Sequence, residues 1–486
     1  MLRKKLAQIE QNRASSDPLP KVTAPYASST FYKLKNVEDK PKAKRWDDRF
    51  SVDSHNQIIS PLKLASRTFN HPDMISLGVA RPSAEYFPWE SMDLFCPDSS
   101  SPGAKSPLES GVRMGCAKGE DDYDLGIAMN YGYSSGSPQL LRYLTEHTEL
   151  LHNPPYQDWE TVLSCGTTSA MEIAFRIFTN PGDTVLMDGY MYSGTITAAQ
   201  AQGLKILGIE MDDQGIIPED LDRKVWSGAK EIYQLAEKHN LFILEDDPYF
   251  YFQMGKHTAD APPTDLDDYI KSLPVSYLSL DVSGRVLRMD TTSKILAPGL
   301  RCGWVTGSSQ VIEKFICYSE VGVVCPSGPS QVMAYKLLDV TWGHEGFIRW
   351  LMNLSAEYRR RRDVLVAACE KHLPSEYCVW QVPEVGMFLW IDLDLSKSNP
   401  TINQVNGSAP WQKYLEVEGD IFSRAQENGV LVSRASWFIP DVKDLKQVSF
   451  RLTFAAAKED TLDRAMERFG RAVRSYFEKG QQNGHA

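Results

Sequence analysis

The stretch from Thr291 to Arg301 reads Thr-Thr-Ser-Lys-Ile-Leu-Ala-Pro-Gly-Leu-Arg. Lys294 follows three hydroxyl side chains, and Arg301 comes seven residues later, past a Pro-Gly turn. A lysine that forms a Schiff base must be held, partly desolvated, beside its carbonyl partner. Hydroxyls and a forked arginine are suited to a dianionic phosphate. The stretch therefore predicts a site for pyridoxal 5'-phosphate (PLP), the alternative being a surface lysine in a Ser/Thr loop.

Length and composition limit the class of protein. The chain has 486 residues, a net charge of -11 and 42% hydrophobic residues. At about 150 residues per domain, two or three domains with a sizeable core are expected. The acidic balance does not favour nucleic-acid binding, and no apolar run approaches the ~18 residues of a membrane span. Eight cysteines without a Cys-x-x-Cys pair are typical of reduced thiols in a cytoplasmic protein, and no metal or nucleotide motif is present.

The N-terminal region is basic. From Met1 to Arg45 there are 11 Lys and Arg residues against 4 Asp and Glu residues. Residues 1–60 are therefore expected to form a flexible basic leader, the alternative being a nucleic-acid-binding arm. Residues 97–120 are rich in Pro, Ser, Gly and Lys and are expected to form a long surface loop.

Beyond the leader, two domains are predicted. In residues 61–345 short apolar strands alternate with helices, which predicts an α/β large domain with a mostly parallel sheet and helices on both faces. Residues 346–486 predict a smaller α+β domain. Strands are expected near 161–163, 184–187, 204–209, 241–244, 286–289, 386–391 and 447–452, and helices near 170–178, 229–238, 348–371 and 458–478.

Several polar motifs directly follow predicted strands, and ligands of parallel sheets bind at the carboxyl ends of the strands. Asp246 could face a pyridine nitrogen and Tyr249 the ring oxygen, although a solvated turn is the alternative. Thr167 and Thr168 follow Gly166 at the start of a helix, where amides and hydroxyls bind phosphate or simply cap the helix.

Two further residues fit a site of this kind. Tyr192 could stack on a flat ring, whereas a lone aromatic is more often a packing residue. Arg451, in the last predicted strand, could bind a carboxylate through two parallel hydrogen bonds, whereas a solvated arginine is the commoner case.

The motifs together resemble the fold type I PLP enzymes, and within them the aromatic amino acid and kynurenine/α-aminoadipate aminotransferases, especially those of fungi. The similarity runs from about residue 75 to residue 477. Its most specific parts are residues 131–138 (Tyr-Gly-Tyr-Ser-Ser-Gly-Ser-Pro), 180–183 (Asn-Pro-Gly-Asp), 245–249 (Glu-Asp-Asp-Pro-Tyr), 291–303 and 386–390 (Gly-Met-Phe-Leu-Trp).

The resemblance implies a role for each candidate residue. Lys294 would carry PLP and move a proton, Asp246 and Tyr249 would face the ring, and Arg451 would bind the substrate α-carboxylate. Tyr192 would stack on the ring, and Tyr131 would reach the phosphate region of the neighbouring subunit in a homodimer. The phosphate would be held by Thr167, Thr168, Thr291, Ser293 and Arg301.

The chain departs from the family at one place. The family carries an Asn-Pro-x-Gly turn between the counterparts of Pro218 and Lys230, whereas only eleven residues, Glu219 through Ala229, lie between them here. The resemblance therefore implies that a few tens of residues, including a strand, are absent near 224–230. Either the fold compensates, or the sequence is a mispredicted or alternative splice product. Milder departures occur at residues 78–82 and at Arg434-Ala435.

The expected function is transamination of aromatic amino acids with a 2-oxo acid acceptor, in secondary metabolism or in general catabolism. A catalytically impaired relative, a PLP lyase or decarboxylase, and a regulatory protein on the same fold are the alternatives. The partners expected are an amino acid, a 2-oxo acid and a second copy of the chain, with no nucleic acid and no membrane.

Overall fold

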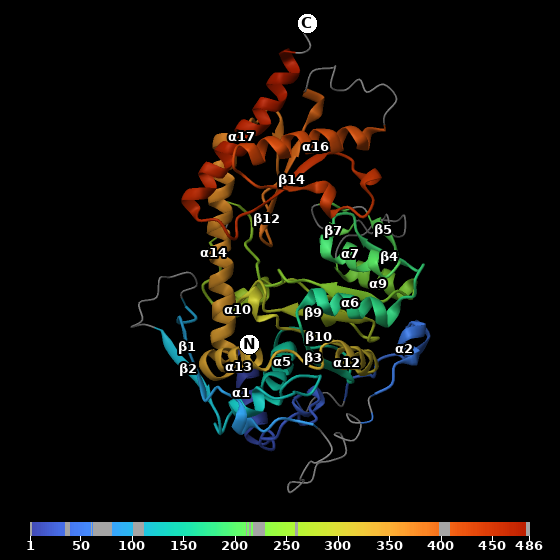
Figure 1. Cartoon of the computed structure of the whole chain (residues 1–486), viewed down its shortest axis with the longest axis vertical. Coiled ribbons are helices and arrows are strands. Elements are labelled where there is room, and N and C mark those ends of the chain that lie inside the picture. The colour runs from blue at the N-terminus through green and yellow to red at the C-terminus, as the bar shows by residue number, and fades with distance from the viewer. Residues whose placement is uncertain are drawn as a thin grey trace.

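The computed structural model describes residues 2–34, 39–59, 61, 80–100, 111–209, 211–212, 215–216, 229–257, 261–397 and 409–482. A large domain surrounds a central sheet, and a smaller domain lies above it (Figure 1). The 30-residue helix α14 (Gly343–His372) runs alongside both domains. No helix among the described residues is long and apolar enough to cross a membrane.

The central sheet has the strand order β3-β10-β9-β8. Its strands are β3 (Trp159–Ser164), β10 (Gly303–Ser308), β9 (Val286–Thr291) and β8 (Ile243–Asp246). β8 and β9 are parallel, whereas β10 is antiparallel to both of its neighbours. Every residue of β9 and β10 is buried, as expected of strands covered on both faces. The predicted α/β class with mostly parallel strands is confirmed, and the reversed direction of β10 is a feature that the sequence pattern did not predict.

A second parallel pair, β4 (Thr184–Asp188) with β5 (Lys205–Ile209), is hydrogen-bonded separately from the central sheet. Val185 and Met187 of β4 nevertheless share one hydrophobic cluster with Leu244 of β8. On the other face Leu186 and Leu207 are paired across the two strands and are 42% and 53% exposed. Within the described residues the sheet is thus interrupted between β8 and β4. Residues 217–228, which include most of the predicted deletion point, lie outside the described residues.

Helices cover the sheet where the sequence provides starting signals. At α5 (Pro138–Leu151) the Ser137 side chain accepts from the Leu140 amide, and Pro138 occupies the first turn. The other large-domain helices are α2 (Val52–Asn56), α4 (Leu125–Ala128), α6 (Thr167–Phe178), α7 (Ser193–Ala201), α9 (Ala229–Lys238), α10 (Leu266–Ser272), α11 (Tyr277–Leu280), α12 (Ser309–Gly322) and α13 (Gly328–Tyr335). Short elements are β6 (Met211–Asp212), β7 (Gly215–Ile216), η1 (Ser29–Phe31), η3 (Asp47–Arg49), η4 (Ala84–Tyr86), η5 (Pro298–Leu300) and the π-helix η6 (Lys336–Trp342).

The prediction of a flexible leader over residues 1–60 is wrong for residues 2–14. Residues 2–14 form helix α1 (Leu2–Ala14), which buries Leu2 and Ile9 against the large domain. Arg13 donates to the buried carboxylates of Glu146 and Asp339 at 2.8 and 2.7 Å. At least one basic residue of this region, Arg13, thus forms ion pairs with residues far away in the sequence.

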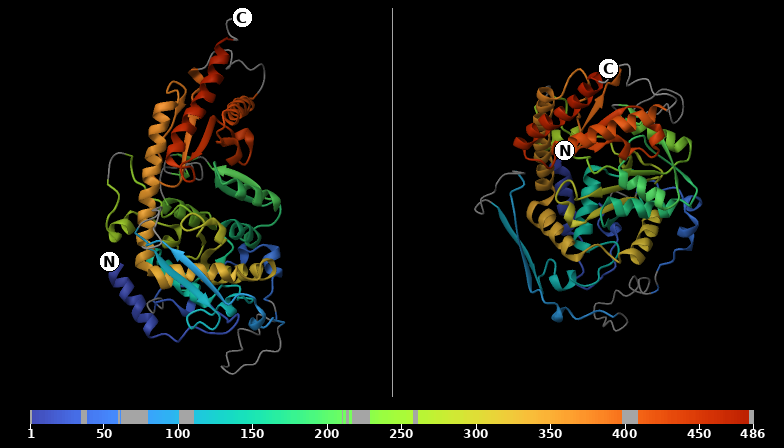
Figure 2. Two further views of the ribbon diagram at one scale, coloured as in Figure 1. Left: turned by 60° about the vertical axis from the view of Figure 1, so that its left-hand side comes forward. Right: turned by 45° about the horizontal axis from the view of Figure 1, so that its top comes forward.

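The predicted surface loop at 97–120 is also partly wrong. Residues 112–117 form β2 (Val112–Ala117), which pairs antiparallel with β1 (Ser91–Cys96). The two strands form a hairpin that projects from the side of the large domain (Figure 2). Only one residue of each strand is fully buried. The apolar pattern of the two strands is therefore too weak for them to be predicted from the sequence.

The small domain contains a four-stranded antiparallel sheet of order β11-β12-β14-β13. Arg361 of α14 donates to the Phe454 carbonyl at 2.7 Å, directly after β14, so the long helix is tied to this sheet. The elements are β11 (Cys378–Val379), β12 (Phe388–Leu393), β13 (Ser433–Arg434), β14 (Val448–Thr453), α16 (Pro410–Glu427), α17 (Glu459–Gln482), η7 (Leu395–Lys397), η8 (Ala435–Phe438) and η9 (Val442–Asp444).

Candidate functional site

The sheet register brings the predicted motifs to one edge. Gly303, the first residue of β10, pairs with Thr291 on one side and with Ser164 on the other. Asp246, the last residue of β8, pairs with Met289 of β9. The carboxyl ends of β3, β8 and β9 therefore lie together, and the loops that carry Thr167, Asp246 and Lys294 all leave from this edge.

The N-terminus of α6 and Arg301 form a cradle for an anion. Arg301 donates to the Cys165 carbonyl at 3.1 Å and lies 3.4 Å from the Ser293 hydroxyl. Gly166 has φ +91°, and a Cβ there would stand 2.5 Å from the Arg301 Nη2 atom. The positive φ favours glycine here, and a side chain at this position would displace the guanidinium from the start of the helix. The free amides of this helix end, with the exposed Thr168 hydroxyl in its first turn, suit a phosphate.

Asp246 lies at the other end of the cradle. Its Oδ1 atom is buried and has no hydrogen-bond partner among the described residues. Burial, followed by repulsion from Asp247 and Asp290, raises the pKa of Asp246 to about 6, while the Thr167 hydroxyl opposes this shift. A buried carboxylate oxygen without a donor is suited to a protonated ring nitrogen, which would supply the missing donor. Thr167 therefore faces the carboxylate as well as the start of α6.

A buried ion-pair network underlies Asp246. Arg288 is fully buried, donates to both oxygens of Asp290 at 3.0 Å and lies 2.9 Å from the Glu245 carboxylate. Glu245 also accepts the backbone amides of Tyr277 and Leu278. Burial raises the pKa of Glu245 and of Asp290, and the charge of Arg288 opposes that rise. The arginine thus stabilises negative charge directly behind the candidate ring site.

Two tyrosines lie near this edge. Burial raises the pKa of Tyr249 to about 12, and the nearby Arg451 opposes the shift. Its ring meets that of Phe388 edge-on at 5.7 Å. Tyr192 is the residue before the first turn of α7, and its side chain is 52% exposed. Its charge also contributes to the rise in the pKa of Tyr249. Both tyrosines are therefore on the side of the site that faces the small domain.

Arg451 comes from the small domain and lies between two phenyl rings. Its guanidinium is 4.0 Å from the centre of the Phe388 ring and 3.8 Å from that of Phe438. Burial lowers the pKa of Arg451, and within the described part of the chain no acceptor bonds its side chain. The rings fix the plane of the guanidinium and leave its donor edge free. The two phenylalanines were not predicted as site residues, because β12 and η8 are far apart in sequence.

Lys294 lies in the turn that follows β9 and is partly buried. Among the residues that the structure describes, its ammonium has no hydrogen-bond or ion-pair partner. Next to it, the Ser293 hydroxyl is 2.9 Å from the Thr291 hydroxyl. A lysine that is held near the cradle but left unpaired is available for covalent chemistry.

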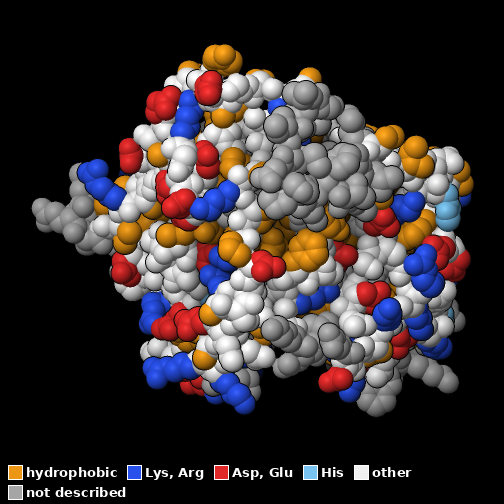
Figure 3. Space-filling view, turned by 90° about the horizontal axis from the view of Figure 1, so that it is seen from below, with side chains coloured by type: hydrophobic (Ala, Val, Ile, Leu, Met, Phe, Trp, Pro, Cys, Tyr) orange, Lys and Arg blue, Asp and Glu red, His pale blue; other side chains and the backbone are white. Residues whose placement is uncertain are grey.

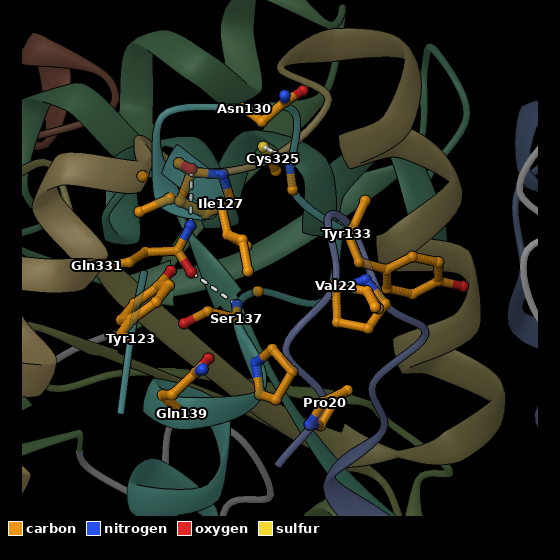
Figure 4. Close-up of a pocket in the computed structure, with 18 residues that line it drawn as sticks. Pro20, Val22, Tyr123, Ile127, Asn130, Tyr133, Ser137, Gln139, Cys325 and Gln331 are labelled. Atoms are coloured by element: carbon orange, nitrogen blue, oxygen red, sulfur yellow. Dashed lines mark hydrogen bonds between the residues drawn. The ribbon is translucent and has the colours of Figure 1, made fainter. Parts of the chain in front are cut away.

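Tyr131 is not brought into this group. It is 56% exposed on the loop before α5, where the neighbouring Gly132 amide lies 3.3 Å from the Cys325 thiol. A small pocket lies beside this loop, and Gln331 bonds the Ser137 amide there at 2.7 Å (Figure 4). Pro20 and Val22 from the N-terminal region also line the pocket, which shows that this region packs against the loop.

The described residues fit PLP at three points. The Gly166–Arg301 cradle suits its phosphate, the unpaired Oδ1 atom of Asp246 suits its ring nitrogen, and the free amine of Lys294 suits its aldehyde. These three groups lie at one sheet edge, so a single small molecule with all three functions accounts for them.

Comparison with known proteins agrees with this geometry. Residues 117–227 and 220–469 match the family described as aminotransferase class I and II, in two stretches that meet where the sequence implies a missing segment. The chain is 44% identical to aminotransferase swnA of Arthroderma benhamiae, over 90% of this chain and 92% of that protein. It is 34% identical to the aromatic amino acid aminotransferase C56E4.03 of Schizosaccharomyces pombe, over 88% and 97%.

A solved structure gives the same result for the fold. The crystal structure of aminotransferase Aro8 from Candida albicans superposes with a TM-score of 0.81 at 33% identity, covering 90% of this chain and all of that one. The shared fold, the family match and the cradle at the sheet edge lead to one conclusion. The chain belongs to the class I and II aminotransferases of fold type I, whose cofactor is pyridoxal phosphate.

Proposed function

We propose that this aminotransferase acts on aromatic amino acids and passes the amino group to a 2-oxo acid. The observation that carries the proposal is the unpaired donor edge of Arg451 between Phe388 and Phe438, because it offers a carboxylate site walled by aromatic rings. Three relatives from Schizosaccharomyces pombe named aromatic amino acid aminotransferases, 34%, 30% and 31% identical to this chain, give further support.

Each candidate residue has a chemical task in this proposal. PLP, when bound, supplies an electron sink for the bond that breaks at the substrate Cα. Lys294 takes the Cα proton and returns it, and Asp246 keeps the ring nitrogen protonated. Tyr249 donates toward the ring oxygen, Tyr192 covers the ring, and Arg451 holds the α-carboxylate. The phosphate is held by Thr167, Thr168, Thr291, Ser293 and Arg301.

A homodimer in the cytoplasm completes the proposal. Tyr131 is exposed on one loop, and Val321, Val323 and Val324 are exposed at the end of α12 and in the residues that follow it. The two segments are neighbours, because the Ser134 hydroxyl donates to the Val324 carbonyl. Apolar side chains also gather near the middle of the face shown in Figure 3. A second copy would cover such a surface and would place Tyr131 at its neighbour's phosphate. None of the eight cysteines, all of which lie among the described residues, forms a disulfide bond, which supports a reducing compartment.

Activity on purified protein tests the substrate class. With phenylalanine, tyrosine or tryptophan as donor and 2-oxoglutarate as acceptor, we expect formation of the matching aromatic 2-oxo acid, and kcat/KM above that for alanine. Release of CO2 or ammonia in place of the 2-oxo acid would instead indicate a decarboxylase or lyase. A folded protein that takes up no PLP would contradict the proposal.

Arg451→Gln tests the carboxylate site. Because a bidentate charge-assisted pair is lost, kcat/KM for phenylalanine is expected to fall about 10²–10³-fold, with PLP affinity unchanged. Steady-state kinetics and PLP titration measure the two effects. Arg360→Gln, which changes an exposed ion pair on α14, is the matched control and should retain activity. Equal losses in both variants would contradict the assignment.

A second candidate is an incomplete splice product with impaired activity. Two observations favour this interpretation. Within the part of the chain that the structure describes, β4 and β5 are hydrogen-bonded separately from the sheet that contains β8, and Leu186 and Leu207 of this pair are exposed. Sequencing of transcripts across codons 224 to 230 would decide whether a longer form is made.

Insertion of the missing segment tests this candidate on the protein itself. The stretch of the Arthroderma benhamiae relative that has no counterpart here is inserted between Trp226 and Ser227. Covering exposed leucines and pairing open strand edges should raise the free energy of unfolding by about 2–5 kcal/mol. Urea unfolding measures the change. An inserted Gly-Ser linker of equal length is the control, and equal stability of the two variants would show that the fold already compensates.

A further inference from the structure

The loop that carries Lys294 receives a side-chain hydrogen bond from helix α14. The turn contributes the bond from the Leu296 amide to the Thr292 carbonyl, and the Thr292 amide is bonded to the Cys302 carbonyl. Ile295, the residue after the lysine, is 2% exposed, and its carbonyl accepts from the Trp350 indole at 2.8 Å. Without that donor the carbonyl would be buried beside an apolar cluster.

Trp350 is itself fixed by its surroundings. It lies on α14 and stacks on Trp342 with ring centres 4.9 Å apart and planes inclined by 26°. Gly346 lies on α14, four residues before Trp350 and four residues after Trp342, the last residue of η6, and a Cβ there would stand 2.9 Å from the Trp342 Cβ atom. The glycine thus gives Trp342 room to lie along the helix against Trp350. The direction of the Trp350 N–H is set by this stack rather than by solvent.

We propose that Trp350 is a positioning residue for Lys294: its indole N–H anchors the Ile295 carbonyl and thereby fixes the direction in which the lysine side chain leaves the loop. The inference rests on the proposed role of Lys294 as the lysine that bonds PLP. Trp350 makes no contact with substrate in this account and acts through the backbone. A reactive amine that is displaced by a fraction of an ångström loses much of its advantage of proximity.

The two stacked tryptophans provide a matched pair of variants. The Trp342 indole N–H is buried and has no acceptor among the described residues, so Trp342→Phe removes an unused donor. Trp350→Phe removes the donor that is in use and keeps an aromatic ring in the stack. If Trp350→Phe fails to fold, Trp350→3-benzothienylalanine replaces the N–H by sulfur and retains the shape of the ring system.

The test measures bond formation between PLP and Lys294 apart from turnover. PLP is titrated into each apo-protein, the visible absorbance of the lysine-bound form is followed against pH, and the bond is trapped with borohydride and mapped. For Trp350→Phe we expect about tenfold weaker PLP binding, a shifted midpoint of the spectral pH titration and a smaller fraction trapped on Lys294. Trp342→Phe should match the parent in all three measurements.

The outcomes separate the inference from the proposed function. A parent protein that forms no bond with PLP at Lys294 would refute the proposed role of the lysine, and the inference with it. A parent that forms the bond, with Trp350→Phe unchanged, would refute the inference alone. Equal weakening in both variants, or a lower melting temperature in Trp350→Phe without a shifted spectral midpoint, would show that the stack contributes packing and not position.

Discussion

Replacement of Lys294 by alanine is expected to reduce transamination at least about 10⁴-fold, because in the proposed function this side chain supplies both the covalent attachment and the proton transfer. The lysine-bound visible absorbance should disappear at the same time. Phosphate and ring contacts would remain, so PLP should still bind, more weakly and as the free aldehyde. Formation of 2-oxo acid and absorption spectra of the purified protein measure the two effects.

Lys205→Ala is the matched control for this experiment. Lys205 is an exposed lysine of β5, away from the sheet edge that carries the site, so its loss should leave activity and absorbance unchanged. Retention of visible absorbance in Lys294→Ala would show that another amine carries the cofactor and would contradict the assignment.

Replacement of Asp246 by asparagine is expected to lower kcat about 10²-fold or more, because an amide cannot hold a proton on the ring nitrogen. The same change should stabilise the apo-protein at neutral pH. Its buried carboxylate has an oxygen without a hydrogen-bond partner in the described part of the chain and lies near two other carboxylates, an arrangement that is unfavourable until the cofactor binds. An aspartate at position 246 is thus expected to favour catalysis and to lower the stability of the apo-protein.

The stabilisation should depend on pH. The pKa of Asp246 is about 6 in the folded chain against an ordinary 3.8, so between these values the folded state holds the proton more firmly than the unfolded state. The parent therefore loses stability as the pH rises from 3.8 to about 6, by at most about 3 kcal/mol at 1.4 kcal/mol per pH unit. Above about pH 6 the loss of unfolding free energy in the parent stays constant. Asp246→Asn has no carboxyl at this position and does not show the loss.

Urea unfolding of the two apo-proteins between pH 4 and 7.5 measures this difference. The free energy of unfolding of Asp246→Asn should increase relative to that of the parent as the pH rises. The difference between the two proteins should be smallest near pH 4. Asp93→Asn, at an exposed position of β1, is the control that changes the same charge without the burial. A parent whose stability does not fall relative to Asp246→Asn over this range would contradict the assignment of a raised pKa.

Much of the site could be predicted because its residues adjoin strands whose ends must meet. Asp246 ends β8, Thr167 follows β3 and Lys294 follows β9. These three strands run in the same direction, with β10 reversed between β3 and β9, and therefore place their carboxyl ends at one edge. The local signals for the cradle, glycine before a helix and hydroxyls around a lysine, lie within a few residues of one another. Such signals do not depend on the rest of the chain.

Other features depend on partners that are remote in sequence. Arg13 lies in a basic stretch whose composition is typical of a solvated leader, and only the folded chain brings it to Glu146 and Asp339. Arg451 could be a solvated arginine until Phe388 and Phe438 enclose it.

The sequence by itself determined the fold class and the family, and it led to the proposal for the lysine loop, because periodicity and short motifs are local properties. The tertiary structure decided where the N-terminal residues pack, which rings enclose the arginine and which tryptophan holds the Lys294 loop. These are contacts between segments tens to hundreds of residues apart, and their energies exist only once the chain has closed the loops between them.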